Sequence, residues 1–298
     1  MTNDPRPHED LLQEEFRTLY RRMQEAGVPP LAVAGGHGLL LKQLWLTGQG
    51  DTADIVVPLD RWRNRTPRAT KDFDVVVDCA LLADKGKQRT IVDVLTACDF
   101  EVTEENPRWQ FEKELGGGRT IILELHAETP DETHGNLAHD RIRVKHKPSL
   151  DEDGVHGRHN PEAIGCHLHP FLVPDEDREI PVPNAITWAI MKLTAMADRH
   201  ANSQKDGISD KDLRFHRDQA KKHASDVCRI VAMASRDEVD HASEIRESLL
   251  DEPAFLRARE IAREYFSSDD GPGMMMTEDQ WERADHRQIR DLLEGWFA

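Results

Sequence analysis

The sequence lacks three features that would each assign it to a class of proteins: a long apolar segment, a paired-cysteine motif and an excess of basic residues. No apolar run approaches the roughly 20 residues of a membrane-spanning helix, and segment 1–16 lacks the basic start and apolar centre of a signal peptide. The four cysteines lie far apart without a CxxC pair, which excludes a cysteine-based zinc framework and suits a reducing compartment. We therefore expect a soluble, cytoplasmic protein with no membrane segment.

Net positive charge is also missing. The 298 residues include 56 acids and 39 bases, a net charge of −17, which excludes a chain-wide basic surface for duplex nucleic acid. Residues 236–298 alone hold 17 acids and 8 bases, so a polyanion site is expected before residue 236. The densest basic stretch carries Arg61, Arg63, Arg65, Arg68 and Lys71. This stretch is either a contact for tRNA or triphosphate, or a solvated loop that balances local acids.

The hydrophobic pattern predicts an α/β protein of the α+β kind, a mixed-sheet core followed by an α-helical domain. Helical spacing of apolar residues predicts helices at 9–26, 37–46, 87–98, 182–200 and 211–234. β-branched or alternating runs predict strands at 31–36, 72–78, 100–105, 108–115 and 119–128. The last two are expected to form a hairpin across Gly116–Gly118. The predicted divisions are a core at 1–130, a connecting region with an extended piece or two at 131–181, and a helical domain at 182–298.

The most informative motif is DFDVVVD at 72–78. Residues two apart on a strand face the same side, about 7 Å apart, so Asp72 and Asp74 can converge on one cation while Phe73 and Val75 face the core. Mg²⁺ suits such a site, which offers one or two carboxylates beside waters and substrate phosphates. A DxD triplet also arises by chance in so acidic a chain, so the neighbouring segments must decide whether this one is a metal site.

Two neighbouring segments support a catalytic interpretation of this motif. Gly35-Gly36-His37 follows a predicted strand and opens a helix, where exposed backbone N–H groups can hold phosphates. Glu124 lies among aliphatic residues, where burial of an acid is costly unless it is paired or metal-bound. Three acids on adjacent strands beside a glycine turn predict a two-metal nucleotidyl-transfer site. The third acid is left open between Glu124 and its neighbours His126 and Glu128.

The helical part adds a lysine and an aspartate. Lys192 lies in an apolar stretch, so its ammonium group must either reach solvent or face a cleft. Asp226 follows Lys221 and Lys222 by four to five residues, a spacing that also fits an ion pair on a helix surface.

In this order, VAGGHGLLL, RATKDFDVVVD, MKLTAMADR and KKHASD resemble the motifs of the DNA polymerase β-type nucleotidyltransferase superfamily, and within it the AbiEii and MenT-like toxins. The resemblance covers about residues 25–130 and 180–235 of the printed sequence. The chain departs from the pattern at His37, where better-known members have serine. It also departs in the long spacing before Asp72, where segment 47–67 is expected to be a lid or a nucleic-acid contact.

The resemblance implies an Mg²⁺-dependent enzyme, with Mn²⁺ as an alternative, that transfers a nucleoside monophosphate from an NTP to an acceptor hydroxyl. The implied metal ligands are Asp72 and Asp74, with Glu124 as a further catalytic acid. The implied nucleotide contacts are Gly35, Gly36, His37, Arg68, Thr70 and Lys192. Lys192 and Asp226 would bind phosphate and orient the acceptor or the base from the helical domain, across a cleft.

The acceptor implied by the toxin resemblance is a tRNA 3′ end, and the implied role is the toxin of a toxin–antitoxin pair with a cognate antitoxin protein. Two alternatives remain open at this point. One is a nucleotidyltransferase for a small cationic molecule of the aminoglycoside type, which an acidic chain would suit. The other is a non-catalytic member that binds only a nucleotide or a protein partner.

A histidine-rich region lies between the two motif groups, with Cys166-His167-Leu168-His169 at its end. These are zinc-ligand types, but their spacing fits no closed structural site. Solvent-exposed loop histidines are therefore expected. The region's histidines are His134, His139, His146, His156, His159, His167 and His169.

Overall fold

The computed structural model describes the chain from residue 8 to residue 298, apart from 51–52, 64–65, 67–69, 71, 105–108, 131–141, 144–153 and 177. One compact unit comprises Met1–Leu41, Arg68–Pro161 and Leu172–Val182. The other comprises Lys42–Pro67, Glu162–Phe171 and Pro183–Ala298. This partition differs from the predicted contiguous division, because 42–67 belongs with the C-terminal helices and 172–182 belongs with the core.

In its described residues the first unit contains a seven-stranded mixed sheet, and the chain has the predicted α+β class. The strand order is β1–β2–β5–β4–β3, with β7 paired to β5 and β6 paired to β7. β2 runs parallel to β5, whereas β1 and β4 run antiparallel to their neighbours. The strands are β1 (Ala32–Val33), β2 (Asp72–Val76), β3 (Glu101–Val102), β4 (Gln110–Gly116), β5 (Arg119–Ala127), β6 (Ile142–Arg143) and β7 (Gly157–His159).

The predicted connecting region holds more strand structure than expected. It contributes β6 and β7 to the main sheet and also forms a separate hairpin of β8 (Phe171–Asp175) and β9 (Arg178–Val182). The predicted hairpin of 108–115 and 119–128 is confirmed, since β4 and β5 pair antiparallel. All three glycines at Gly116–Gly118 have positive φ, a conformation that favours glycine in this tight turn.

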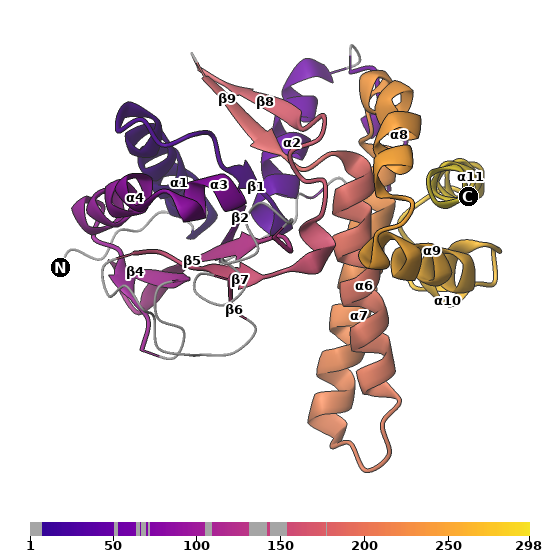
Figure 1. The fold of residues 1–298 in the computed structure, drawn as a ribbon. Helices are drawn as coiled ribbons and strands as arrows, with labels where there is room; N and C mark the ends of the chain where they lie inside the picture. Colours follow the sequence, from indigo (N-terminus) through magenta and orange to yellow (C-terminus); the bar gives the residue numbers. More distant parts are fainter. Residues whose placement is uncertain are drawn as a thin grey trace. The chain divides into compact units, whose positions relative to one another are not determined.

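Helices α1 (His8–Glu25), α3 (Cys79–Ala83) and α4 (Lys85–Ala97) lie on one side of the main sheet (Figure 1). Phe73 of β2 is fully buried there, with its ring centroid 5.2 Å from that of Phe16 on α1. Because side chains alternate along a strand, Asp72 and Asp74 point to the opposite face of β2 and are only partly buried. The local sequence thus places the acids of the DFD motif on the face that these helices leave open.

The second unit is helical, as predicted for the C-terminal part. Its long α6 (Ala185–Ser203) and α7 (Asp210–Ala232) pack against each other as a hairpin (Figure 1). Three helices start with a side-chain cap: Asn184 caps α6, Ser209 caps α7, and Ser235 forms a capping box with Glu238 on α8. The remaining helices are α8 (Arg236–Leu249), α9 (Pro253–Phe266), α10 (Pro272–Met275) and α11 (Arg283–Phe297).

Candidate functional site

Three potential metal ligands converge on the open face of the first unit's sheet. Parallel pairing of β2 with β5 places Asp74 directly opposite Glu124, and His126 follows two residues later on the same face. Ligand atoms of these three side chains all lie within 4.8 Å of one another. Glu128, an alternative in the sequence, lies beyond the end of β5.

His126 bridges the two carboxylates. Its Nε2 lies 3.3 Å from Oδ1 of Asp74 and 3.5 Å from Oε2 of Glu124. The Asp74 and Glu124 side chains are 23% and 18% exposed, so each is shielded without being sealed from solvent. Two carboxylates this close repel each other unless a cation or hydrogen-bond donors offset the charge.

Two donors that the sequence did not reveal hold Glu124. The Gln110 side chain on β4 donates to Oε1 at 2.8 Å, and Nη1 of Arg158 on β7 lies 3.1 Å from Oε2. The Arg158 guanidinium also lies over the ring of Trp109, 5.3 Å from its centroid. Arg158 comes from the predicted connecting region 131–181, where an extended piece or two was expected but no strand was located. Its register opposite His126 is therefore visible only in the fold.

Asp72 lies beside this group rather than within it. Among the described residues, the candidate metal group that contains Asp74 does not include Asp72. The buried Thr70 donates its hydroxyl hydrogen bond to Oδ1 of Asp72, and Asp72 lies opposite Ile122 in the sheet register. The metal role of Asp72 and the nucleotide role of Thr70 stay predictions.

The glycine pair lies against Asp74. Helix α2 (Gly35–Gln49) begins at Gly35, so both glycines form its first turn rather than a turn before residue 37. A Cβ on Gly35 would lie 1.7 Å from Oδ2 of Asp74, and the φ of Gly35 is +61°, so this position requires glycine. The carboxylate thus lies where the helix dipole favours negative charge.

Exposed backbone N–H groups at this turn were predicted, and that prediction is wrong. Gly35, Gly36 and His37 are all buried. The His37 imidazole packs between Phe16 and Phe73, with ring centroids 4.5 and 4.9 Å away. Burial lowers its pKa from 6.5 to about 3, so the ring is neutral. The His37 side chain is a core residue and not a nucleotide contact.

In the second unit, the fold brings the predicted Lys192 and Asp226 together. Nζ of Lys192 lies 3.3 Å from Oδ2 of Asp226, and their side chains are 8% and 2% exposed. Burial excludes both the snorkelling alternative for the lysine and the helix-surface ion pair for the aspartate. Nδ1 of His223 lies 3.9 Å from the same oxygen. The sequence did not indicate that Lys192 and Asp226 would form an ion pair.

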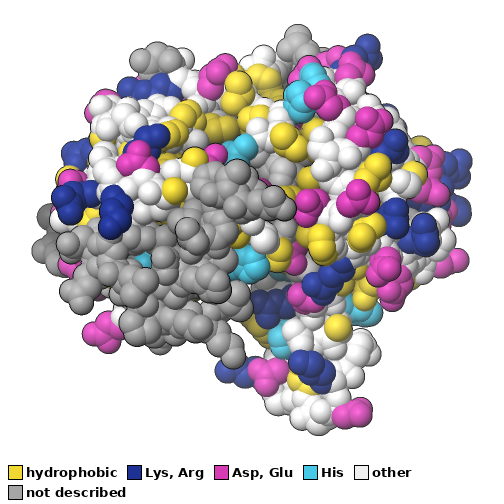
Figure 2. All heavy atoms as spheres, viewed as in Figure 1, with side chains coloured by type: hydrophobic (Ala, Val, Ile, Leu, Met, Phe, Trp, Pro, Cys, Tyr) yellow, Lys and Arg dark blue, Asp and Glu magenta, His cyan; other side chains and the backbone are white. Residues whose placement is uncertain are grey.

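Segment 47–67 is neither a lid nor a free basic patch in its described part. Val56 and Val57 donate backbone hydrogen bonds to Ala234 and Ala232, and Trp62 packs on Trp281. Arg61 pairs with Asp285 and Arg63 with Glu282, which favours the alternative of a loop that balances acids. Figure 2 shows basic and acidic side chains interspersed over the described part of the visible face. Arg65, Arg68 and Lys71 lie outside the described residues.

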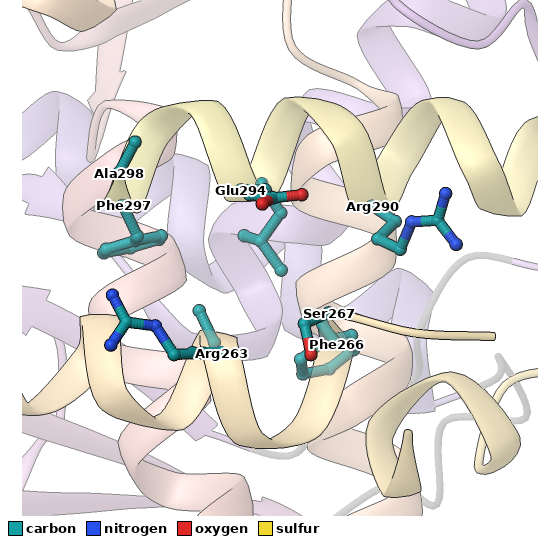
Figure 3. Close-up of a pocket in the computed structure, with 9 residues that line it drawn as sticks. Arg263, Phe266, Ser267, Arg290, Glu294, Phe297 and Ala298 are labelled. Carbon is teal, nitrogen blue, oxygen red and sulfur yellow. The ribbon is translucent and has the colours of Figure 1, made fainter. Parts of the chain in front are cut away.

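The cavity shown in Figure 3 lies elsewhere, between α9 and α11 of the second unit, and has a volume of about 240 Å³. Phe266 and Phe297 supply apolar surface, and the charged side chains of Arg263 on α9 and Glu294 on α11 also line the cavity (Figure 3). None of the predicted site residues that the structure describes lines this cavity. It therefore gives no support to a nucleotide site there.

No protein family, curated protein or solved structure in the comparisons matches this chain. Among the helices of the described residues, none combines the length and apolar character needed to cross a bilayer.

Proposed function

We propose that the chain is a metal-dependent nucleotidyltransferase that transfers a nucleoside monophosphate from an NTP to an acceptor hydroxyl. The observation that carries the proposal is the in-register pair Asp74 and Glu124, on parallel strands, with Asp74 against the first turn of α2. Like-charged groups held this close, and still partly exposed, favour a bound cation. A tRNA 3′ end as acceptor, a toxin role and an antitoxin partner belong to the same proposal and derive from the motif resemblance.

The donor set fits a hard divalent cation. Asp74 and Glu124 offer carboxylate oxygens, the ligands that Mg²⁺ prefers, and Asp72 is two residues away on the same strand face. Asp74 and Glu124, with Asp72, would hold Mg²⁺ or Mn²⁺. The bound ion would neutralise charge on the substrate phosphates.

The chain's own residues organise this site. Gln110 and Arg158 fix the orientation of Glu124, and His126 spaces it from Asp74. The Arg158 side chain is half exposed, so the same guanidinium can contact a phosphate group of the nucleotide. In phosphoryl transfer such positioning and charge complementarity account for most of the catalysis.

A non-catalytic role is the second candidate, and a specific observation favours it. Glu124 already receives hydrogen bonds from Gln110 and Arg158, and the glycine turn is buried. These contacts provide hydrogen-bond partners for both oxygens of Glu124 without a metal ion or a substrate. In that case the acids would serve structure or the binding of a nucleotide without transfer.

A transfer assay separates these candidates. Purified protein is incubated with each radiolabelled NTP, Mg²⁺ and total tRNA, and separately with small cationic acceptors. We expect label on tRNA, and about a 10³-fold loss of rate for Asp74→Asn, equivalent to about 4 kcal/mol of transition-state stabilisation. The matched control is Asp93→Asn, an exposed acid on α4 of the same unit, which should retain the wild-type rate.

The outcomes of this assay are distinct. Label on small acceptors alone would replace the tRNA acceptor with a small molecule. NTP binding without any transfer would establish the non-catalytic role. Equal transfer rates for Asp74→Asn and Asp93→Asn would refute the assignment of the site.

A further inference from the structure

A second group of metal-ligand side chains lies in the helical unit and shares no residue with the proposed nucleotidyl-transfer site. Its members are His169, in the loop before β8, and His241 and Glu244 on α8 (Figure 1). Their ligand atoms lie within 4.8 Å of one another, and all three side chains are at least partly exposed. Nε2 of His169 is 3.2 Å from Oε1 of Glu244.

Helix α8 places two of these ligands on one face and orients the His241 ring. His241 and Glu244 are three residues apart, so they lie on the same face of α8. Nδ1 of His241 lies 2.9 Å from the backbone oxygen of Asp237, a contact in which the ring nitrogen donates. The other nitrogen, Nε2, then carries the lone pair that a metal needs, and a backbone acceptor of this kind fixes the ring in metal sites.

The third ligand is held in place by the loop that carries it. Asn184, which is fully buried, donates to the backbone oxygens of Gly165 and Leu168, and Thr187 donates to that of Ile164. His169 itself has a φ of +43°, a left-handed conformation that is uncommon outside glycine. Its ring stacks on that of His241, with centroids 4.3 Å apart and the ring planes 24° apart, so binding of one ion by both rings requires the His169 side chain to turn about its torsions. A constrained backbone at a position that presents a ligand type favours a functional explanation.

We propose that His169, His241 and Glu244 bind a divalent transition-metal ion, Zn²⁺ in the first instance, and so join loop 162–171 to α8. Two imidazoles and one carboxylate are a known zinc ligand set, which leaves a position for water. Helix α8 contains five acids and two arginines, so the local field attracts cations. His169 belongs to the 166–169 run of zinc-ligand types noted in the sequence, but its partners His241 and Glu244 lie more than 70 residues further along the chain, so the group itself is visible only in the fold.

Zinc titration of metal-free protein tests the proposal. The titration is done in the Asp74→Asn background, so that the carboxylate group of the first unit does not contribute. Calorimetry should show one bound Zn²⁺ per chain, and Co²⁺ substitution should give the visible absorption of a low-symmetry site. His169→Ala and His241→Ala should each weaken Zn²⁺ binding at least about tenfold, a threshold set by the 10–100-fold losses that outer-shell partners alone produce.

Matched controls lie next to the ligands. Glu247→Gln is on the same helix, and His167→Gln is on the same loop, and both should bind Zn²⁺ as the parent does. Glu244→Gln, an exposed and conservative change, should weaken binding while the far-ultraviolet circular dichroism stays unchanged. If none of the three ligand variants differs from the controls, the site is refuted. Such a result would leave the nucleotidyltransferase proposal untouched, because the two groups share no residue.

Discussion

The two units use ionisable side chains in different ways. In the first unit, the acids Asp74 and Glu124 converge on a partly exposed sheet face, with His126 between them. In the second unit, two buried lysines each have a buried acid as partner: Lys42 has Glu238 and Lys192 has Asp226. Like charges that lie close together lower the stability of the folded state. In a buried ion pair, by contrast, each charge needs its partner, because neither charge is solvated by water.

This difference indicates which residues serve binding and which serve the fold. Removal of one acid from the first unit should relieve repulsion and leave the unit folded. Removal of one charge from a buried pair should leave its partner desolvated and alone. Lys192 and Asp226 fit neither description fully, because the pair is buried like a structural one and yet carries predicted catalytic roles.

The largest effect on stability is expected at Lys42. Its ammonium group lies 2.6 and 2.8 Å from the two Glu238 oxygens and 4.1 Å from the centroid of the Phe171 ring. Burial lowers the lysine pKa and Glu238 opposes that shift, so loss of the cation strands a buried carboxylate. Lys42→Met should lower the free energy of unfolding by about 3–5 kcal/mol in urea titrations.

Two controls sharpen this prediction. Lys42→Met with Glu238→Gln should regain most of the lost stability, because no charge is then stranded and the side-chain amide oxygen can still accept the hydrogen bond from the Ser235 N–H that caps α8. Asp74→Asn should not lower the free energy of unfolding, since it removes one of two like charges. A comparable loss in Asp74→Asn and Lys42→Met would contradict the contrast between the units.

Lys192 is expected to show a smaller but more telling effect. Lys192→Met alone should destabilise the second unit, and Lys192→Met with Asp226→Leu should restore the midpoint of urea unfolding. If Lys192 also binds phosphate, the double variant stays about 100-fold slower in nucleotidyl transfer, close to 2.7 kcal/mol. Recovery of stability and rate together would assign the pair to the fold alone.

Local pattern accounts for what could be predicted. The alternation in 72–76 indicated a strand and the face of its acids, and three glycines marked the hairpin of β4 and β5. The parallel register of β2 on β5 could not be read, because it joins residues about 50 apart and depends on tertiary packing. That register is what selects Glu124 over Glu128.

The residues missed by sequence reasoning share this non-local origin. Arg158 and Gln110 reach Glu124 from two other strands, and neither lies in a recognisable motif. The partners of segment 47–67 lie some 160 to 230 residues further along the chain, so its polar composition suggested a lid or a nucleic-acid contact rather than a packed element. The charge and periodicity of a segment indicate its local structure, but they do not indicate which distant segment it will pack against.

The smallest of these effects concerns a residue that the sequence placed in the nucleotide site and the fold places in the core. The His37 pKa is about 3 in the folded chain and 6.5 when unfolded, because burial disfavours the charged ring. Between these values the unfolded chain binds the extra proton, so the free energy of unfolding falls as pH decreases from about 6.5. By pH 5 the loss relative to pH 7 should reach about 2 kcal/mol.

His37→Leu removes the pH-dependent contribution of His37 to the free energy of unfolding and keeps an apolar side chain between Phe16 and Phe73. Urea unfolding of both proteins from pH 7 to pH 5 isolates it, because the other titrating groups are common to both. The curves of unfolding free energy against pH should therefore diverge, with the wild type losing about 2 kcal/mol more. Parallel curves would mean that His37 is reached by solvent protons in the folded chain, and would reopen a role for its ring beside Asp74.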